Sequence, residues 1–326
     1  MKRSAVICCL LAGLACAAGE DLYTRSTYVM GTVAAVKLYA SDEAAVQDQA
    51  ARVFAEMRRL EDIFTNYRDS ELTRLNRDAA RTPVTLSGEM FELLRLSLEY
   101  SEKYHRAFDV TVGPAVRAWG FLGGPFRVPC ADERRRLRQV VGADGLRFDS
   151  TRRTVSFRRP GMELDFGGIA KGYAAEKAAR LLARLGVRRA LVNLGDSSFF
   201  ALGPPPGRRG WPVAVLDPRP PHAPAAVLEL PPFHALSTSG TYGRSFREAG
   251  ALYTHLFDPR TAEPVSLEAS ATVICRSGAE SEAASKAVLL LAPAQLAAFK
   301  DIEWLRLEVR SGRRGAALLV SSNSDR

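Results

Sequence analysis

Histidine and cysteine are scarce in this sequence, which limits the metal chemistry that it can support. Among 326 residues there are four histidines and five cysteines. The histidines lie apart from one another, at His105, His222, His234 and His255. No cysteines have the spacing of a zinc site, so zinc-finger and histidine-rich centres are excluded. Cys130 and Cys275, the two cysteines beyond residue 20, either form a disulfide or stay free and buried, and both alternatives remain open.

Long apolar runs and blocks of like charge are also missing. The longest apolar segment, residues 5–18, is shorter than the roughly 18 residues that a membrane-spanning helix requires. The 45 basic and 36 acidic side chains are interspersed and give a net charge of +9. This pattern predicts a cationic surface suited to anionic ligands and argues against nucleic acid as a partner. The 47% of hydrophobic residues predicts a sizeable buried core.

The first 19 residues have the pattern of a secretory signal peptide. Lys2 and Arg3 precede the apolar run, and small residues end it. Two processing routes remain open. Signal peptidase could recognise residues 15–17, or the segment is a lipoprotein signal that leaves Cys16 as a lipidated N-terminus. Either route predicts an exported protein, periplasmic or associated with the inner membrane, whose single domain spans residues 20–326.

Hydrophobic periodicity predicts mixed helices and strands in that domain. Apolar residues at steps of three and four predict helices over residues 44–64, 88–104, 172–185 and 280–291. Strands are predicted over residues 28–38, 190–194 and 211–216, with a hairpin over 304–320 and short strands within 147–164 around a turn at 159–161. Because the strands and helices do not alternate regularly, the sequence predicts an α+β fold with mixed sheets and packed helices.

A glycine-rich segment, residues 165–173, lies between a predicted strand and a predicted helix. Gly167 and Gly168 allow a ligand to approach the backbone closely, and free N–H groups at a helix start can bind phosphate. Lys171 adds positive charge, while Asp165 could accept a hydrogen bond from a ligand. The spacing is neither that of a P-loop nor that of a Rossmann motif. The alternative is a capped helix start whose glycines serve packing.

Three further segments carry polar side chains of catalytic type. His255 and Asp258 place an imidazole and a carboxylate near a proline turn, where a general base could form, although a structural histidine is the alternative. Hydroxyls precede a glycine in residues 238–240. Glu282 and Lys286 are helical neighbours four residues apart, a spacing that is also typical of a simple surface ion pair.

Taken in order, these segments resemble the ApbE family of exported FAD:protein FMN transferases. The matching segments are residues 28–32, 64–67, 70–76, 108–121, 165–173, 191–195, 238–240 and 255–261. The resemblance implies an ApbE-like fold with the FAD site in a cleft between subdomains. It also implies that the protein cleaves FAD, attaches FMN through a phosphoester to a Thr or Ser of an exported or membrane redox subunit, and releases AMP.

The resemblance assigns roles to individual residues. His255, with Asp258 nearby, is the candidate base for the acceptor hydroxyl. The implied FAD contacts are Met30, Tyr67, Ala107, Phe108, Asp109, Asp165, Lys171, Thr238, Ser239, Gly240 and Leu256. The family also holds Mg²⁺ through a main-chain carbonyl, which is that of Gly168 here, through an Asp, whose position Glu282 takes, and through a Thr four residues further on. Ser285 is the additional candidate ligand of this chain.

This chain departs from the family pattern at the metal site. Lys286 stands where the usual ligand is Thr, and a protonated lysine has no lone pair to give to a metal. Its ammonium either replaces the cation or points outward while Glu282 and Ser285 hold Mg²⁺. Asp196 and Ala262 also stand where the pattern has Gly. Metal dependence is therefore open.

Two classes of function follow from these residues. The first is an active FMN transferase with a modified metal site, in which the retained His255, Asp258 and Asp165 serve catalysis. The second is a catalytically impaired flavin-binding or maturation protein, which Lys286 favours. A hydrolase that splits FAD with water as the acceptor would use the same site.

Overall fold

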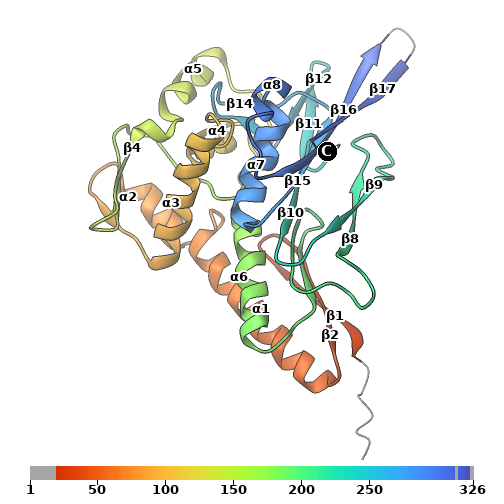
Figure 1. Ribbon diagram of the computed structural model, residues 1–326. Coiled ribbons are helices and arrows are strands. Elements are labelled where there is room, and N and C mark those ends of the chain that lie inside the picture. Colours follow the sequence, from red (N-terminus) through yellow and green to blue (C-terminus); the bar gives the residue numbers. More distant parts are fainter. Residues whose placement is uncertain (1–19, 313–314, 324–326) are drawn as a thin grey trace, which may run out of the picture.

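An antiparallel sheet of eight strands lies at the centre of the computed structural model, which describes residues 20–312 and 315–323 (Figure 1). The predicted signal peptide, residues 1–19, lies outside the described residues. The strand order is β1-β2-β6-β7-β10-β15-β16-β17. The strands are β1 (Asp21–Val29), β2 (Thr32–Ala40), β6 (Ala190–Leu194), β7 (Ser198–Ala201), β10 (Ala235–Gly240), β15 (Ala269–Cys275), β16 (Glu303–Gly312) and β17 (Gly315–Ser322).

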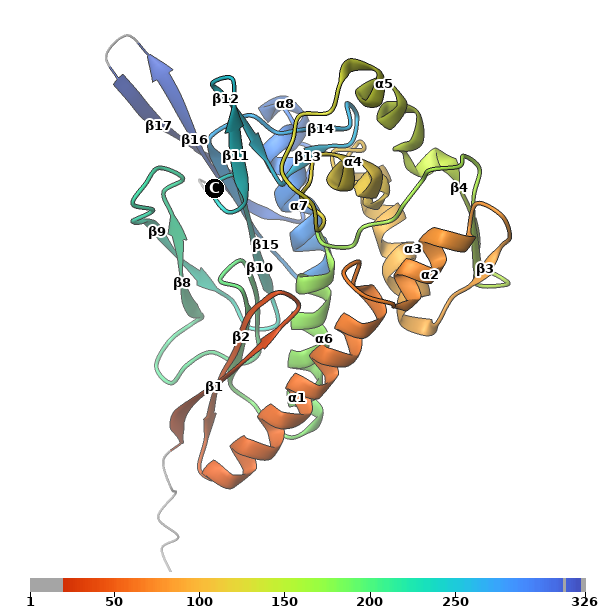
Figure 2. The same ribbon diagram turned by 180° about the vertical axis from the view of Figure 1, so that it is seen from behind.

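Helices cover one face of this sheet, as both views show (Figures 1 and 2). They are α1 (Glu43–Phe64), α6 (Ala170–Arg184) and α7 (Gly278–Leu290), and α3 (Gly88–Lys103) packs outside them against α7 and α1. The apolar stripe predicted on α1 is buried, from Val46 to Phe64. Along β6, Ala190, Val192 and Leu194 pack in the core between sheet and helices, because alternate residues of a strand face the same side.

The opposite face of the sheet is covered by a two-stranded hairpin, β8 (Trp211–Leu216) and β9 (Pro224–Leu230). Trp211, Val213 and Leu230 of this hairpin form a second apolar cluster with Leu191 and Leu236 of the sheet. The strand predicted over residues 211–216 is therefore one half of a hairpin that packs on the second face of the sheet.

Short elements complete the chain around the helical layer. The helices are α2 (Glu71–Asp78), α4 (Gly113–Ala118), α5 (Ala131–Val140) and α8 (Pro293–Leu296), with 3₁₀ turns η1 (Val110–Val112) and η2 (Ala143–Gly145). The strands are β3 (Val84–Thr85), β4 (Leu146–Asp149) and β5 (Thr154–Phe157) in one sheet, and the pairs β11 (Ser245–Glu248) with β12 (Ala251–Thr254) and β13 (Phe257–Asp258) with β14 (Glu263–Pro264). Within the described residues, no helix combines the length and apolarity needed to cross a membrane.

Most predicted elements are confirmed within two residues of their ends, and so is the α+β class. Two strand predictions are wrong in detail. Residues 28–38 do not form one strand, because Met30 and Gly31 both have positive φ, of 55° and 72°, and turn the chain between β1 and β2. The turn between β4 and β5 is at residues 150–153, and residues 159–161 follow β5. Asp149 fixes the first of these turns by accepting hydrogen bonds from the backbone N–H groups of Thr151 and Arg152.

The two cysteines of the domain are both free. Cys130 is exposed and Cys275 is buried, so no disulfide joins them. Cys275 donates to the carbonyl of Ser277, and burial raises the pKa of its thiol. The prediction of free, buried thiols is therefore confirmed for Cys275, whereas Cys130 is free but exposed.

Candidate active site

The crossing of α6 and α7 brings distant charged residues together. A Cβ atom at Gly172 would lie 2.0 Å from the carbonyl oxygen of Gly278, and one at Gly278 would lie 2.1 Å from the carbonyl oxygen of Gly172. Only glycine at both positions allows the two backbones to approach this closely. As a result Lys171, at the start of α6, reaches Glu282 on α7 across 111 residues of sequence.

Glu282 is the centre of a buried cluster of charges. Its side chain is 3% exposed. One carboxylate oxygen, Oε1, accepts from Lys171 Nζ at 3.1 Å and from Ser198 Oγ at 2.5 Å. The other, Oε2, accepts from Lys286 Nζ at 2.8 Å. Burial opposes ionisation of this carboxyl, but the charges of Lys171 and Lys286 outweigh it and lower its pKa to about 2. Glu282 is therefore ionised at neutral pH.

Lys286 lies along the glycine-rich segment and does not point outward. A Cβ atom at Gly168 would lie 3.1 Å from Lys286 Cε and 3.6 Å from a ring carbon of Phe108. The ammonium also donates to the carbonyl oxygen of Glu282 at 3.1 Å. Burial lowers the pKa of Lys286, and the neighbouring carboxylate opposes that shift. The side chain thus fills the space between the glycine-rich segment and α7.

The residues expected to hold magnesium do not fit that ion as they are arranged. Ser285 is fully buried and turns toward β10, where its Oγ contacts Ser239 Oγ at 2.7 Å and donates to the carbonyl of Glu282 at 2.8 Å. Both oxygens of Glu282 already accept from cations, and an ammonium offers a metal only donors. Mg²⁺ requires a nearly octahedral shell of oxygens. The described residues also contain no group of three His, Cys, Asp or Glu placed to hold a metal.

His255 is positioned by the β11–β12 hairpin. Ala249 and Gly250 turn this hairpin with positive φ, as a two-residue loop requires. The pairing continues beyond β12, so that His255 N donates to Arg244 O at 2.9 Å and His255 Nδ1 lies 3.1 Å from the same oxygen. A carbonyl oxygen only accepts, so Nδ1 carries the proton and the lone pair of Nε2 is free.

The charge state of His255 suits a general base. Burial lowers the pKa of the imidazole, the bond to Arg244 opposes this, and the positive charges of Lys286 and Lys171 lower it further, to about 4. The ring is therefore neutral at pH 7 and lies within the field of both lysines. A neutral imidazole with a free Nε2 can take a proton from a hydroxyl.

Asp258 does not orient His255. Its carboxylate accepts from Arg260 Nε at 2.8 Å and Arg260 Nη2 at 2.7 Å, within the turn between β13 and β14. The carbonyl of Arg244 orients the ring instead, and the structure gives Asp258, predicted as a catalytic residue, no contact with His255. Sequence reasoning missed Arg244, although Ala249-Gly250 signals the hairpin that sets it opposite His255. It also missed Ser198, for which the sequence gives no signal.

Thr238 and Ser239 point to opposite faces of β10, as successive strand residues must. Ser239 faces α7 and bonds Ser285, whereas Thr238 Oγ1 contacts Thr272 Oγ1 at 2.9 Å. The three residues 238–240 therefore cannot present both hydroxyls to one ligand. Gly240 is needed for packing, since a Cβ there would lie 2.4 Å from the ring of Tyr242.

The other residues predicted to contact FAD differ in their exposure. Tyr67 is 66% exposed, and its hydroxyl accepts from Arg244 Nη1 at 3.4 Å. Met30 is half-buried in the turn between β1 and β2. The carbonyl of Leu256 accepts from Val265 N at 2.7 Å. Tyr67 is thus linked through Arg244 to the loop of His255.

Asp109 and Asp165 both accept hydrogen bonds from backbone N–H groups, Asp165 within its own loop and Asp109 also from a distant turn. Asp109 is 4% exposed and accepts from Thr111 N, Thr111 Oγ1 and Ala143 N at 2.7 to 2.9 Å. Ala107 and Phe108, which precede it, are buried in the main core. Asp165 accepts from Gly167 N at 2.6 Å, and burial raises its pKa. Asp165 thereby holds the glycine-rich segment in shape.

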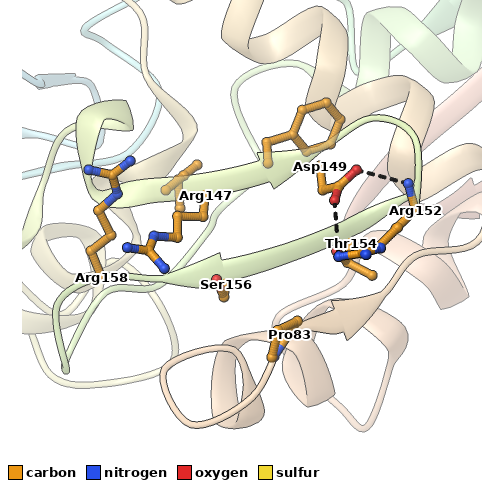
Figure 3. A pocket seen from close by; sticks show the side chains of 9 residues that line it. Pro83, Arg147, Asp149, Arg152, Thr154, Ser156 and Arg158 are labelled. Atoms are coloured by element: carbon orange, nitrogen blue, oxygen red, sulfur yellow. Dashed lines mark hydrogen bonds and ion pairs between the residues drawn. The ribbon is translucent and has the colours of Figure 1, made fainter.

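Two hollows open on the surface. One, of about 650 Å³, is lined by Asp109 and by several arginines, among them Arg106 and Arg260. The other, of about 550 Å³, lies on the β4–β5 hairpin, where Arg147, Arg152 and Arg158 surround it (Figure 3). None of the residues predicted to bind FAD lines this second hollow. The cleft between subdomains stays a prediction.

Comparisons with known proteins identify the family to which this chain is similar. Residues 30–307 match the model of the ApbE family. An FAD:protein FMN transferase of Klebsiella pneumoniae (strain 342) is 35% identical over 258 residues, which are 78% of this chain and 77% of that protein. One of Treponema pallidum (strain Nichols) is 30% identical over 309 residues, 89% of this chain and 85% of that protein. The apo crystal structure of Pseudomonas stutzeri flavinyl transferase ApbE superposes with a TM-score of 0.80 at 27% identity, covering 94% of this chain and 96% of that one.

Proposed function

The chain belongs to the ApbE family, and we propose that it is an FAD:protein FMN transferase. One observation carries the proposal. The free Nε2 of a neutral His255 lies in the field of two lysines that share the buried carboxylate of Glu282, beside a glycine-rich segment. Phosphoryl transfer from a pyrophosphate to a hydroxyl requires a base for the hydroxyl proton and positive charge near the phosphates. His255 and the two lysines provide these groups beside the glycine-rich segment.

The reaction can be written with these residues. His255 Nε2 takes the proton of a Thr or Ser hydroxyl on the acceptor protein. The hydroxyl oxygen bonds the phosphorus of the FMN half of FAD, and the bond from that phosphorus to the bridging oxygen breaks. The electron pair stays on the phosphate of AMP, which leaves. Lys171 offsets the negative charge that grows on the phosphates, and fixed positive charge is most effective where water is excluded.

The alternative of an impaired flavin-binding protein explains less of the site. Binding FAD needs positive charge and an open backbone, but it does not need an imidazole kept neutral with a free lone pair. A hydrolase would use the same residues with water in place of the acceptor hydroxyl, so the two enzymes differ only in the acceptor.

The proposal extends to location and partner. Residues 1–19 have the pattern of an export signal, which either signal peptidase cleaves near residues 15–17 or lipoprotein processing cuts to leave Cys16 with a lipid anchor. The acceptor is then a redox subunit with a target Thr or Ser on the exported side of the membrane. The net charge of +9 favours approach to anionic lipid headgroups. Glu282 and Ser285 do not fit Mg²⁺ as they stand, because their oxygens already bond Lys171, Lys286, Ser198 and Ser239.

Exchange of His255 tests the proposal. His255→Ala is expected to lower AMP release and flavin transfer at least 100-fold and to leave FAD affinity near normal, because a general base acts mainly in the transition state. AMP is measured by chromatography and FAD binding by flavin fluorescence. His234→Ala is the matched control, since His234 Nδ1 also contacts a carbonyl oxygen, that of Pro232, at 2.9 Å. Weak FAD binding with unchanged turnover in His255→Ala would contradict the role of this residue.

A further inference from the structure

Resting on the proposed function, we infer that Lys286 supplies the positive charge at the FAD pyrophosphate, so that this protein transfers FMN without a divalent metal ion. The inference concerns a residue at which the chain departs from its family, and it makes Lys286 a catalytic residue that touches the phosphates.

The three charged side chains are ordered by depth. The side chain of Glu282 is 3% exposed, that of Lys286 14% and that of Lys171 24%. The carboxylate thus lies at the base of the cluster, and both ammonium groups lie nearer the surface. A ligand that approaches from solvent meets the two cations first.

Both ammonium groups keep donors for such a ligand. A lysine ammonium has three N–H donors. Lys286 uses two of them within the described chain, toward Oε2 and the carbonyl oxygen of Glu282. Lys171 uses one, toward Glu282 Oε1. With both lysines protonated, as their pairing with the ionised Glu282 favours, the cluster carries a net charge of +1, and its free donors suit the oxygens of a phosphate.

The position of Lys286 connects it to the reacting atoms. Its Cε lies within 3.1 Å of where a Cβ of Gly168 would be, so that the side chain follows the glycine-rich segment. Its positive charge also contributes to the lowered pKa of His255. Because Lys286 is held at two points by Glu282, its ammonium needs little rearrangement when the phosphates bind.

The contacts of Lys286 with Glu282 also oppose the binding of a metal ion at this carboxylate. A cation at Glu282 would have to displace Lys286 from Oε2, and the displaced ammonium would lose its partner in a nearly closed space. Ser285, the other candidate ligand, is turned toward Ser239. Lys286 therefore takes the carboxylate oxygen that a cation at Glu282 would need and brings a positive charge to it.

The transfer balances without a further reactant. The acceptor oxygen bonds the FMN phosphorus, the bond from that phosphorus to the bridging oxygen breaks, and the electron pair stays with AMP. The hydroxyl proton goes to His255 Nε2. Lys286 donates hydrogen bonds to the phosphate oxygens throughout and ends in its starting protonation state.

The unmodified protein gives the first test. After dialysis against EDTA, AMP release and acceptor flavinylation are measured in EDTA and in excess Mg²⁺, and the two rates are expected to agree within about twofold. A rate that appears only with Mg²⁺ would overturn this inference and leave the transferase standing. No AMP under either condition, despite FAD binding, would overturn the transferase and the inference together.

Variants of Lys286 give the second test. Lys286→Met is expected to lose about 100-fold in AMP release, as when one oxyanion donor is removed. Lys177→Met is the matched control, because Lys177 also pairs with a carboxylate, Glu92, at 2.8 Å. Equal rates in the two variants would contradict a catalytic Lys286.

A binding measurement separates a catalytic from a structural effect. Mn²⁺ binding, followed by electron paramagnetic resonance, is expected to be absent in the unmodified protein and present in the double variant Glu282→Asp with Lys286→Thr. The double variant should also release AMP only when Mg²⁺ is added. Tight Mn²⁺ binding by the unmodified protein would refute the replacement of the ion by Lys286.

Discussion

The contact between Gly172 and Gly278 predicts a large effect from one added methyl group. In Gly172→Ala the new Cβ would lie 2.0 Å from Gly278 O, 2.8 Å from Gly278 C and 2.7 Å from Glu282 Cγ. Two of these atoms belong to backbone and cannot rotate away. Since the shortest carbon–oxygen contacts are about 3.3 Å, α6 and α7 must move apart by about 1 Å.

The expected loss of stability follows from two opposing effects. Alanine gains about 1 kcal/mol over glycine inside a helix. Overpacking costs about 1–3 kcal/mol, and the rigid backbone here places the cost at the upper end. We therefore expect the free energy of unfolding to fall by about 2 kcal/mol. The separation also pulls Lys171 from Glu282, and a shift of about 1 Å in a catalytic group lowers rates on the order of 100-fold.

Urea denaturation and AMP release measure the two effects separately. Gly88→Ala is the control, because Gly88 opens α3 and a Cβ there has nothing within 4 Å. The control should keep or slightly raise the stability and leave the rate unchanged. Equal stabilities of the two variants would refute the account of how the helices bring Lys171 to Glu282.

Two further predictions concern His255 and Ser239. With its pKa lowered to about 4, His255 stays neutral as the pH falls through about 6.5, where an ordinary imidazole gains its proton. The value of kcat/KM should therefore fall only near pH 4, and a decline centred near 6.5 would contradict the shift. Because the unfolded chain binds this proton first, the same shift makes the free energy of unfolding decrease as the pH falls from about 6.5 toward 4. Ser239→Ala removes the contact with Ser285 and should lower the free energy of unfolding by about 1 kcal/mol; a weakened FAD affinity, measured by fluorescence titration, would instead support the ligand contact that the family resemblance implies.

The sequence predicts the helices well because each has a continuous apolar stripe. The stripe from Val46 to Phe64 determines α1 without help from the rest of the chain. Strand ends depend on single backbone angles. The β-rich pattern runs through Met30 and Gly31, and only their positive φ ends β1 there.

Two departures from the family pattern show how much backbone conformation the sequence conceals. Asp196 and Ala262 stand where glycine is usual, and both have positive φ, of 51° and 57°. Asn193 supports Asp196, accepting from its backbone N at 3.0 Å and donating to Oδ1 at 2.6 Å. Both positions therefore adopt the left-handed conformation without a glycine.

The candidate site could be predicted only in part. The family resemblance identifies Lys171, His255 and Glu282, but not how they are joined. The bond from Lys171 to Glu282 spans 111 residues, and its formation depends on the helix crossing at Gly172 and Gly278. No local pattern encodes a contact of this range. For the same reason, the sequence leaves open whether Lys286 points inward. In the structure it does, and its ammonium bonds Glu282.

The ratio of AMP released to FMN attached tests the transferase most directly. The protein is incubated with FAD and an acceptor that bears the target Thr, AMP is quantified by chromatography, and attached FMN is located by mass spectrometry. We predict one AMP for each FMN on the Thr hydroxyl, and no AMP from FAD when that Thr is replaced by Val. AMP released together with free FMN would identify a hydrolase, and no AMP despite FAD binding would identify a flavin-binding protein; either result would contradict the account.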